Sequence, residues 1–266
     1  MRLKVSLAFA LLVAALLVVS GAPAASKATY YVSLGDSLAQ GYQPIGGPLS
    51  PESPPGYNHG YADELFKLVR HRYTQLREVK LGCGGESTVT FRTGGICTYD
   101  HGSQLAEAVA FLQEHTGEVA FVTIDLGAND VLSGGGVADI GANLPPALAA
   151  LTAAAGTGVP IIGMNYYDPF LAPVWFQTQS LAALQAEAAT TVGFNDFLES
   201  IYGAFGLEVA DVETAFSVTD LTLVGGTPVN VLRTCAWTWM CSAGDIHANT
   251  VGYGVMAQAF LAELDD

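Results

Sequence analysis

Basic residues are scarce in this chain. Its 266 residues include 10 lysines and arginines against 25 aspartates and glutamates, so the formal net charge is -15. Nucleic acids and anionic lipid surfaces repel an acidic protein at long range, and the charge therefore argues against both as partners. The chain is long enough for one well-buried domain and short for two.

Long apolar runs are absent beyond residue 30. The exception lies at the N-terminus, where Arg2 and Lys4 precede an apolar stretch, Val5 to Val19, that small residues follow. This stretch is shorter than the about 20 residues that a comfortable membrane span needs. We predict a secretory signal peptide over residues 1–25, cleaved near Ala24, and a single secreted domain over 26–266 with no stable membrane anchor. The alternative is an uncleaved N-terminal anchor.

Cysteine is limited to four residues, and none of them forms a C-x-x-C motif: Cys83, Cys97, Cys235 and Cys241. An even count in an exported chain favours disulfides. Three pairings are possible, and we favour the local one that closes short loops, Cys83 with Cys97 and Cys235 with Cys241. A zinc site is the rival interpretation, but export disfavours free thiolates.

Several motifs of known hydrolases and nucleotide-binding proteins are also missing. A G-x-S-x-G elbow around Ser37 would need glycine at 39, where the chain has Ala39. No H-E-x-x-H motif is present, so a zinc hydrolase is unsupported. The glycine-rich stretches at 46–47 and 134–136 lack the lysine of a phosphate-binding loop.

What the sequence does contain is an alternation of strand-like and helix-like segments. Such alternation predicts a parallel sheet with helices on both faces. The strands are expected at 29–34, 77–81, 119–126, 159–165 and 207–212, and the helices at 61–72, 103–115, 144–155, within 176–203, and at 249–264, with a Pro/Gly-rich loop over 43–60. In the helix at 144–155, Pro145 and Pro146 are expected in the first turn.

Three polar sites follow three of these strands. Ser37 follows the first strand, Gly85 the second and Asn129 the third. Because ligands bind outside the carboxyl ends of parallel strands, these sites should converge at one edge of the sheet. Each has an ordinary structural interpretation: Ser37 and Asn129 can cap helices, and Gly85 can turn the chain. Taken together, they suggest a nucleophile with oxyanion donors.

A serine nucleophile needs a base, and His247 is the best candidate among five histidines. It lies just before the last helix, with Asp245 two residues upstream. A carboxylate there can accept the Nδ1 proton and leave Nε2 facing the serine. The other four histidines are expected on the surface, or in loops without an acidic partner at short spacing: His59, His71, His101 and His115.

These residues lie in four blocks that together resemble the SGNH, or GDSL-type, ester hydrolase family. The blocks are "GDSL" at 35–38, "CGGEST" at 83–88, "GAND" at 127–130 and "DIHANTVGY" at 245–253. The resemblance implies a three-layer α/β/α sandwich with a central, mostly parallel five-stranded sheet. It also implies Ser37 as nucleophile, His247 as base, and Ser37, Gly85 and Asn129 as oxyanion donors. The cysteines before the second and last blocks are similar to those of the exported bacterial branch.

The last block departs from the usual D-x-x-H pattern of the family. Asp245 and His247 are separated by one residue, and Gly244 occupies the usual aspartate position. Either Asp245 reaches Nδ1 from the shorter spacing, or a backbone carbonyl near Gly244 orients the ring and Asp245 caps the final helix.

We therefore expect a monomeric, secreted carboxylic ester hydrolase, an esterase or lipase, that needs no metal or organic cofactor. A phospholipase and a carbohydrate O-deacetylase are the alternatives for the same site, and a non-catalytic secreted binding domain is a remote one. Asp36 and Asp130 are expected to fix loops through backbone N–H groups. Four large aromatic residues are candidates for the walls of the substrate site, with ordinary core packing as the alternative for each: Trp175, Phe176, Trp237 and Trp239.

Overall fold

The computed structural model describes residues 29–44 and 59–264. The predicted signal peptide lies outside the described residues, and so do residues 45–58 of the predicted loop at 43–60.

Five parallel strands form the centre of the molecule in the order β2-β1-β3-β4-β5. They are β1 (Thr29–Gly35), β2 (Leu76–Lys80), β3 (Val119–Asp125), β4 (Ile161–Met164) and β5 (Glu208–Ala210). This order has its switch point between β1 and β3, where the chain leaves the two strands in opposite directions. The predicted fold class is confirmed, with a central sheet that is wholly parallel. A short antiparallel pair, β6 (Leu223–Val224) and β7 (Thr227–Pro228), lies apart from it.

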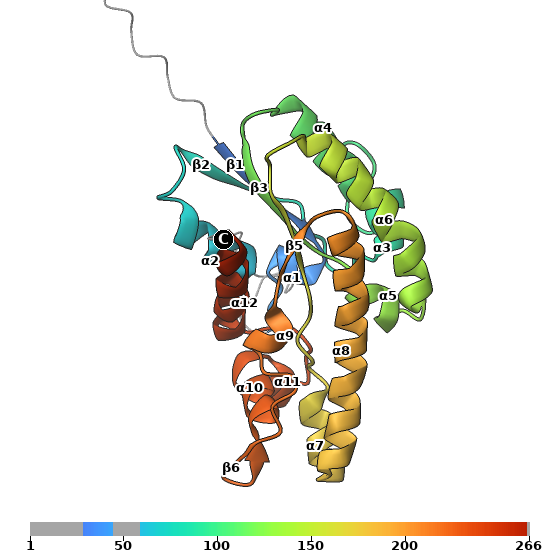
Figure 1. Cartoon of the computed structure of the whole chain (residues 1–266), viewed down its shortest axis with the longest axis vertical. Coiled ribbons are helices and arrows are strands. Elements are labelled where there is room, and N and C mark those ends of the chain that lie inside the picture. Colours follow the sequence, from blue (N-terminus) through green and yellow to red (C-terminus); the bar gives the residue numbers. More distant parts are fainter. Residues whose placement is uncertain (1–28, 45–58, 265–266) are drawn as a thin grey trace, which may run out of the picture.

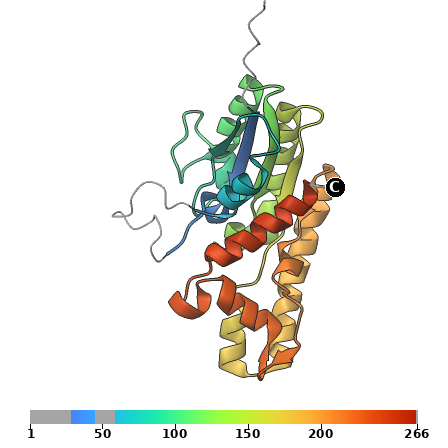
Figure 2. The same ribbon diagram turned by 90° about the vertical axis from the view of Figure 1, so that its left-hand side faces the viewer.

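Helices cover both faces of the sheet. In Figure 1, α2 and α12 lie on one side, where they pack against each other, while α3, α4, α5 and α6 lie on the other. Figure 2 shows α12 crossing in front of the sheet. The helices on the described residues are α1 (Ser37–Gln40), α2 (Tyr61–Val69), α3 (Thr88–Thr93), α4 (Gln104–Glu114), α5 (Ala128–Leu132), α6 (Gly136–Ala155), α7 (Leu171–Thr178), α8 (Leu181–Ala204), α9 (Val212–Ala215), α10 (Val229–Trp237), α11 (Met240–Ala243) and α12 (Thr250–Glu263). Across residues 29–44 and 59–264, none is both long enough and apolar enough for a membrane crossing.

The central strands are buried because helices cover both of their faces. Along β3, every residue except Ala120 is buried, and the last five residues of β1 are buried as well. This is why the sequence of β3 is a nearly continuous apolar run rather than an alternating one. The two strands therefore hold their carboxyl ends, Gly35 and Asp125, side by side in register.

Two helices differ from their predicted form. The helix predicted at 144–155 begins at Gly136, so Pro145 and Pro146 lie in its interior and not in its first turn. Interior prolines remove backbone hydrogen bonds at a cost of about 3 kcal/mol or more, and the buried face of α6, which includes Leu144 and Leu148, offsets that cost. The region predicted as one helix within 176–203 contains the end of α7 and most of α8, because Gln179 takes a left-handed conformation and Ser180 caps α8.

Gly35 allows the closest approach between the two central strand ends. Its φ is +134°, and a Cβ at this position would lie 2.2 Å from Asp125 Oδ1. We expect Gly35→Ala to lower the free energy of unfolding by about 3–5 kcal/mol, from overpacking and backbone strain together. Urea unfolding followed by circular dichroism would measure the loss.

Gly206→Ala is the matched control for this prediction. Gly206 also has a positive φ, +71°, but a Cβ there would meet no atom within 4 Å. Its substitution should cost only about 1–2 kcal/mol of backbone strain. Equal losses for the two variants would contradict the steric argument.

Candidate active site

Ser37 is the first residue of α1, directly beyond the carboxyl end of β1. It does not cap this helix, because Asp36 is the N-cap and its carboxylate accepts a hydrogen bond from the N–H of Leu38 at 2.8 Å. The serine hydroxyl is therefore free of a capping role.

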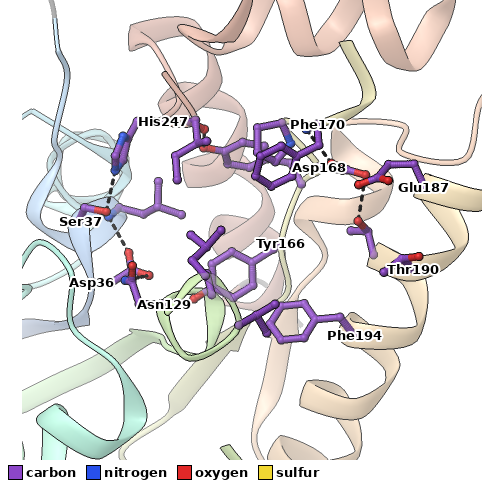
Figure 3. Close-up of a pocket in the computed structure, with 18 residues that line it drawn as sticks. Asp36, Ser37, Asn129, Tyr166, Asp168, Phe170, Glu187, Thr190, Phe194 and His247 are labelled. Carbon is purple, nitrogen blue, oxygen red and sulfur yellow. Dashed lines mark hydrogen bonds between the residues drawn. The ribbon is translucent and has the colours of Figure 1, made fainter. Parts of the chain in front are cut away.

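Ser37, His247 and Asp245 form a continuous series of hydrogen bonds. Ser37 Oγ lies 2.7 Å from His247 Nε2, and His247 Nδ1 lies 2.7 Å from Asp245 Oδ1 (Figure 3). The same carboxylate oxygen accepts the backbone N–H of His247 at 2.9 Å. The sequence left open whether Asp245 or a backbone carbonyl contacts Nδ1 of His247. In the structure it is the Asp245 carboxylate that does so. The final helix, α12, is capped by Asn249 instead.

The loop that carries His247 is tied down on several sides. The Trp239 N–H donates to the carbonyl of His247 at 2.9 Å, and the Tyr167 hydroxyl donates to the carbonyl of Ile246 at 2.8 Å. A disulfide between Cys235 and Cys241 joins α10 to α11 just upstream. The ring of Tyr42 packs edge-on against the imidazole, with 4.3 Å between centroids. These contacts restrict both the position of the loop and the tilt of the histidine ring.

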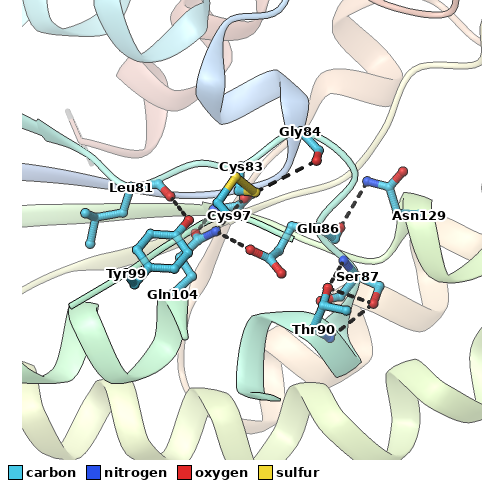
Figure 4. The surroundings of a disulfide bond; sticks show 11 residues. Leu81, Cys83, Gly84, Glu86, Ser87, Thr90, Cys97, Tyr99, Gln104 and Asn129 are labelled. Carbon is cyan, nitrogen blue, oxygen red and sulfur yellow. Dashed lines mark hydrogen bonds between the residues drawn. A yellow bond between two sulfur atoms is a disulfide. The ribbon is translucent and has the colours of Figure 1, made fainter. Parts of the chain in front are cut away.

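Gly85 lies on the loop between β2 and α3, with φ at +82°. The other predicted disulfide pair, Cys83 and Cys97, closes this loop, and the N–H of Cys83 donates to the carbonyl of Gly35 at 3.0 Å. Figure 4 shows the disulfide and the hydrogen bonds that hold this loop in place. Within the described residues, the backbone N–H groups of Ser37 and Gly85 donate no hydrogen bond to the protein. Both are therefore available as donors to a bound group.

Asn129 lies in the first turn of α5, after β3. Its side-chain amide donates to Asp36 Oδ2 at 3.3 Å and to the carbonyl of Glu86 at 3.0 Å. The next residue, Asp130, accepts hydrogen bonds from the N–H and hydroxyl of Thr88 at 2.8 and 2.5 Å. Asp36 and Asp130 therefore accept hydrogen bonds from backbone N–H groups, as expected. The bonds from Thr88 to Asp130 also join α3 to α5.

Two carboxyl groups are buried beneath the serine. Asp125 accepts the Tyr61 hydroxyl at 2.7 Å and the Asp36 N–H at 3.4 Å. Burial, and next the negative charge of Asp36, raise the pKa of Asp125 well above its usual range. Burial also raises the pKa of Asp36, but hydrogen bonds from Asp125 and the Leu38 N–H oppose that rise. Asp125 is therefore the member of the pair that keeps its proton, and Asp36 the one that carries charge.

A third buried carboxyl, that of Glu86, is held by the amide of Gln104 at 3.0 Å. Burial raises the pKa of Glu86 as well. The same Gln104 side chain accepts the N–H of Gly35 and donates to its carbonyl, at 2.6 and 2.9 Å. This one amide therefore joins the end of β1 to the loop that carries Gly85 (Figure 4).

A pocket of ≈ 250 Å³ extends from Ser37 and His247 towards α7 and α8 (Figure 3). Apolar and aromatic side chains line it near the serine and along its length, and its far end is polar, with Asp168, Glu187 and Thr190. Burial raises the pKa of Asp168 to about 6. The apolar and aromatic lining consists of Leu38, Ala128, Val131, Leu132, Tyr166, Tyr167, Pro169, Phe170, Phe194 and Ile246.

None of the four candidate wall residues lines this pocket: Trp175, Phe176, Trp237 and Trp239. Trp175 is buried in α7, and the side chain of Phe176, on the next residue, is 59% exposed. Trp237 packs against Phe216 and under Arg233. The sequence overlooked the actual wall residues because they follow β4 or lie on α8, and no local motif marks them.

Three other histidines have acidic partners, and for His59 and His101 this is against expectation. The distances are 2.6 Å from His59 Nε2 to Glu64, 2.9 Å from His101 Nδ1 to Glu107 and 3.1 Å from His115 Nδ1 to Glu118. Within the described structure, none of the three histidines lines the pocket. Across the same described residues, no group of three or more His, Cys, Asp or Glu side chains is arranged to hold a metal ion.

Residues 33–255 match the sequence model of the GDSL-like Lipase/Acylhydrolase family. The match covers most of the chain, and the chain belongs to this family. Family membership supports an ester hydrolase as the class of the protein. A search of curated proteins gave no match.

Similar folds among solved structures include a variant of an acetyl xylan esterase from Geobacillus stearothermophilus. The TM-score is 0.58 at 18% identity, covering 89% of this chain and 94% of that one. The lipase Lip_vut3 from a goat rumen metagenome has a TM-score of 0.53 at 17% identity, covering 88% and 96% of the two chains. At sequence identities of 17–18%, the similarity to these structures shows the fold alone.

Proposed function

We propose that the protein is a secreted carboxylic ester hydrolase that forms an acyl-enzyme on Ser37. The observation that carries this proposal is the hydrogen-bonded series of Asp245, His247 and Ser37, with both side-chain contacts at 2.7 Å, at the mouth of a pocket. A serine hydroxyl becomes an effective nucleophile when an adjacent base takes its proton. The two disulfides are consistent with an exported protein.

The reaction follows from the arrangement of these three side chains. His247 Nε2 takes the proton of Ser37 as its oxygen attacks the ester carbonyl carbon, and the imidazolium then gives that proton to the departing alcohol oxygen. The acyl group stays on Ser37 until a water molecule, deprotonated by the same Nε2, releases it as the acid. Asp245 holds the ring through Nδ1 and stabilises the imidazolium in both steps.

Three groups can donate to the carbonyl oxygen as it becomes an anion: the backbone N–H groups of Ser37 and Gly85 and the side-chain amide of Asn129. Among the described residues, neither N–H group has a protein acceptor. The Asn129 amide has to release one of its two present hydrogen bonds first. One oxyanion donor typically contributes about 3–4 kcal/mol to lowering the barrier.

The pocket suggests an ester with an apolar part close to the scissile bond. Leu38, Tyr166 and Ile246 line the end near the serine, which favours acyl groups of modest size. A specific observation also favours a second candidate function, carbohydrate O-deacetylation. Asp168, Glu187 and Thr190 line the far end, and such groups accept or donate hydrogen bonds to sugar hydroxyls.

The test is hydrolysis of p-nitrophenyl acetate, butyrate, octanoate and palmitate by the purified mature protein, together with labelling by diethyl p-nitrophenyl phosphate. We expect turnover, with an optimum below palmitate because the pocket is small. We also expect one phosphoryl group per chain on the peptide that contains Ser37, with parallel loss of activity.

Acetyl release from acetylated xylan, measured beside the p-nitrophenyl esters, distinguishes the two candidate functions. Faster release from the polysaccharide would favour the deacetylase. Absence of both turnover and phosphoryl labelling in a folded preparation would refute the proposal and favour a binding domain.

A further inference from the structure

The amide of Asn129 is fully engaged within the protein. An amide nitrogen has two N–H groups, and here they donate to Asp36 Oδ2 and to the Glu86 carbonyl. An oxyanion can therefore receive a hydrogen bond from Asn129 only if one of these bonds is released. The bond to Asp36, at 3.3 Å, is longer than the usual 2.9–3.0 Å and is the weaker of the two.

Release of the bond from Asn129 would leave the Asp36 carboxylate with one hydrogen-bond donor fewer. Its carboxylate is 2% exposed, and its other oxygen, Oδ1, already accepts the N–H of Leu38. Oδ2 accepts the side-chain amide of Asn129, and the carboxyl of Asp125 also hydrogen-bonds this group. A buried carboxylate oxygen that loses its donor is destabilised, and the destabilisation would oppose stabilisation of the oxyanion.

The hydroxyl of Tyr166 is an unused donor beside this carboxylate. Tyr166 is 5% exposed, and its hydroxyl makes no hydrogen bond of normal geometry to any described residue. In Figure 3 the hydroxyl points towards Asp36 and Asn129. It lies close enough to Asp36 to help lower the pKa of that carboxyl. Burial, with the charges of Asp36 and Asp125, raises the pKa of Tyr166 well above its usual range, so the hydroxyl keeps its proton.

The position of Tyr166 is fixed independently of Asp36. Its N–H donates to Asn195 Oδ1 at 2.9 Å, and its carbonyl accepts from Asn195 Nδ2 at 2.8 Å. Its ring packs against Phe194, with 5.8 Å between centroids. Both partners belong to α8, which therefore holds the hydroxyl in place before substrate binds.

We propose that Tyr166 is a positioning residue that replaces Asn129 as the donor to Asp36 when the Asn129 amide turns to the oxyanion. The inference rests on the proposed ester hydrolysis. Tyr166 does not touch the reacting atoms, and no covalent bond changes in this exchange. Its hydroxyl keeps the Asp36 carboxylate hydrogen-bonded in the transition state, which leaves Asn129 free to donate.

The test is Tyr166→Phe, assayed with the best p-nitrophenyl ester and by thermal unfolding. The exchange occurs only in the transition state, so we expect kcat to fall by about ten-fold or more while KM stays within about two-fold. The melting temperature should stay the same or rise, because the substitution removes a buried hydroxyl that has no partner in the free protein. A lower melting temperature, or an unchanged kcat, would overturn the proposal.

Two further variants make the test specific. Tyr202→Phe removes another buried hydroxyl without a partner, at a residue that does not line the pocket, and should leave kcat unchanged. In an Asn129→Ala background no exchange can occur, so Tyr166→Phe should lower kcat by less than about two-fold. An equal effect of Tyr166→Phe in both backgrounds would also overturn the proposal. Absence of turnover in the wild-type protein would instead be a failure of the proposed function.

Discussion

Ser37→Ala is expected to lower kcat for ester hydrolysis by about 10⁴–10⁶-fold, the range seen when the nucleophile of a serine triad is removed. The hydroxyl is the group that Nε2 of His247 contacts at 2.7 Å, and alanine leaves the base with nothing to activate. The variant should remain folded, because Asp36 and not Ser37 caps α1. Residual hydrolysis would come from the oxyanion donors and from water. Steady-state kinetics with p-nitrophenyl butyrate would measure the loss.

Ser33→Ala is the matched control for this variant. Ser33 lies on β1, four residues before Ser37, and its buried hydroxyl has no hydrogen-bond partner among the described residues. Its removal should change kcat by less than about two-fold, since it touches no reacting group. Comparable activity in Ser37→Ala and the wild-type protein would exclude Ser37 as the nucleophile.

Asp245→Ala is expected to lower kcat by about 10⁴-fold, because the carboxylate both orients His247 and stabilises the imidazolium. Asp245→Asn should lose a similar factor, about 10⁴-fold, because its amide can donate to Nδ1 and hold the ring in the wrong tautomer. In the structure one carboxylate oxygen of Asp245 meets the ring and the backbone N–H at 2.7 and 2.9 Å. Similar losses in the two variants would show that the role of Asp245 requires a carboxylate and not only a side chain of that size.

Glu107→Ala provides the control, because it removes the carboxylate of another acid–histidine pair, that of His101, outside the pocket. It should leave kcat unchanged. If Asp245→Ala were no slower than the wild-type protein, Asp245 would have no catalytic role. If Asp245→Asn were much faster than Asp245→Ala, the amide oxygen would still accept from Nδ1, and the charge would contribute little.

The strand-end rule explains why much of the site was predictable. Ser37 and Asn129 follow β1 and β3, the two strands on either side of the switch point in the order β2-β1-β3-β4-β5. Parallel strands end at a common edge, so residues that follow them meet there whatever their separation in sequence. The strand-end rule does not predict the position of His247, which follows a helical region. His247 contacts Ser37 although the two residues are 210 positions apart in the sequence. Its assignment rested on the neighbouring aspartate and on the family resemblance.

The pocket walls were not predictable in this way. Tyr166 and Phe170 follow β4, and Phe194 comes from the middle of α8. Which aromatic residue faces the serine depends on the start of α8 at Ser180 and on its packing, not on residue type. The sequence therefore offered the tryptophans only as candidates, with ordinary core packing as the alternative, and Trp175 and Trp237 do pack within the protein.

The sequence by itself determined the parallel α/β architecture and the four blocks from which the site is built, and it favoured the local pairing of the cysteines. These depend on residue periodicity, short loops and the strand-end rule, which act over short stretches of chain. Only the tertiary structure decided that Asp245 reaches Nδ1, that Asp36 and Asp125 are buried together, and that Asn129 is engaged beside an unpartnered Tyr166 hydroxyl. Those features arise from contacts between side chains on different elements, whose distances are set by how the helices pack on the sheet.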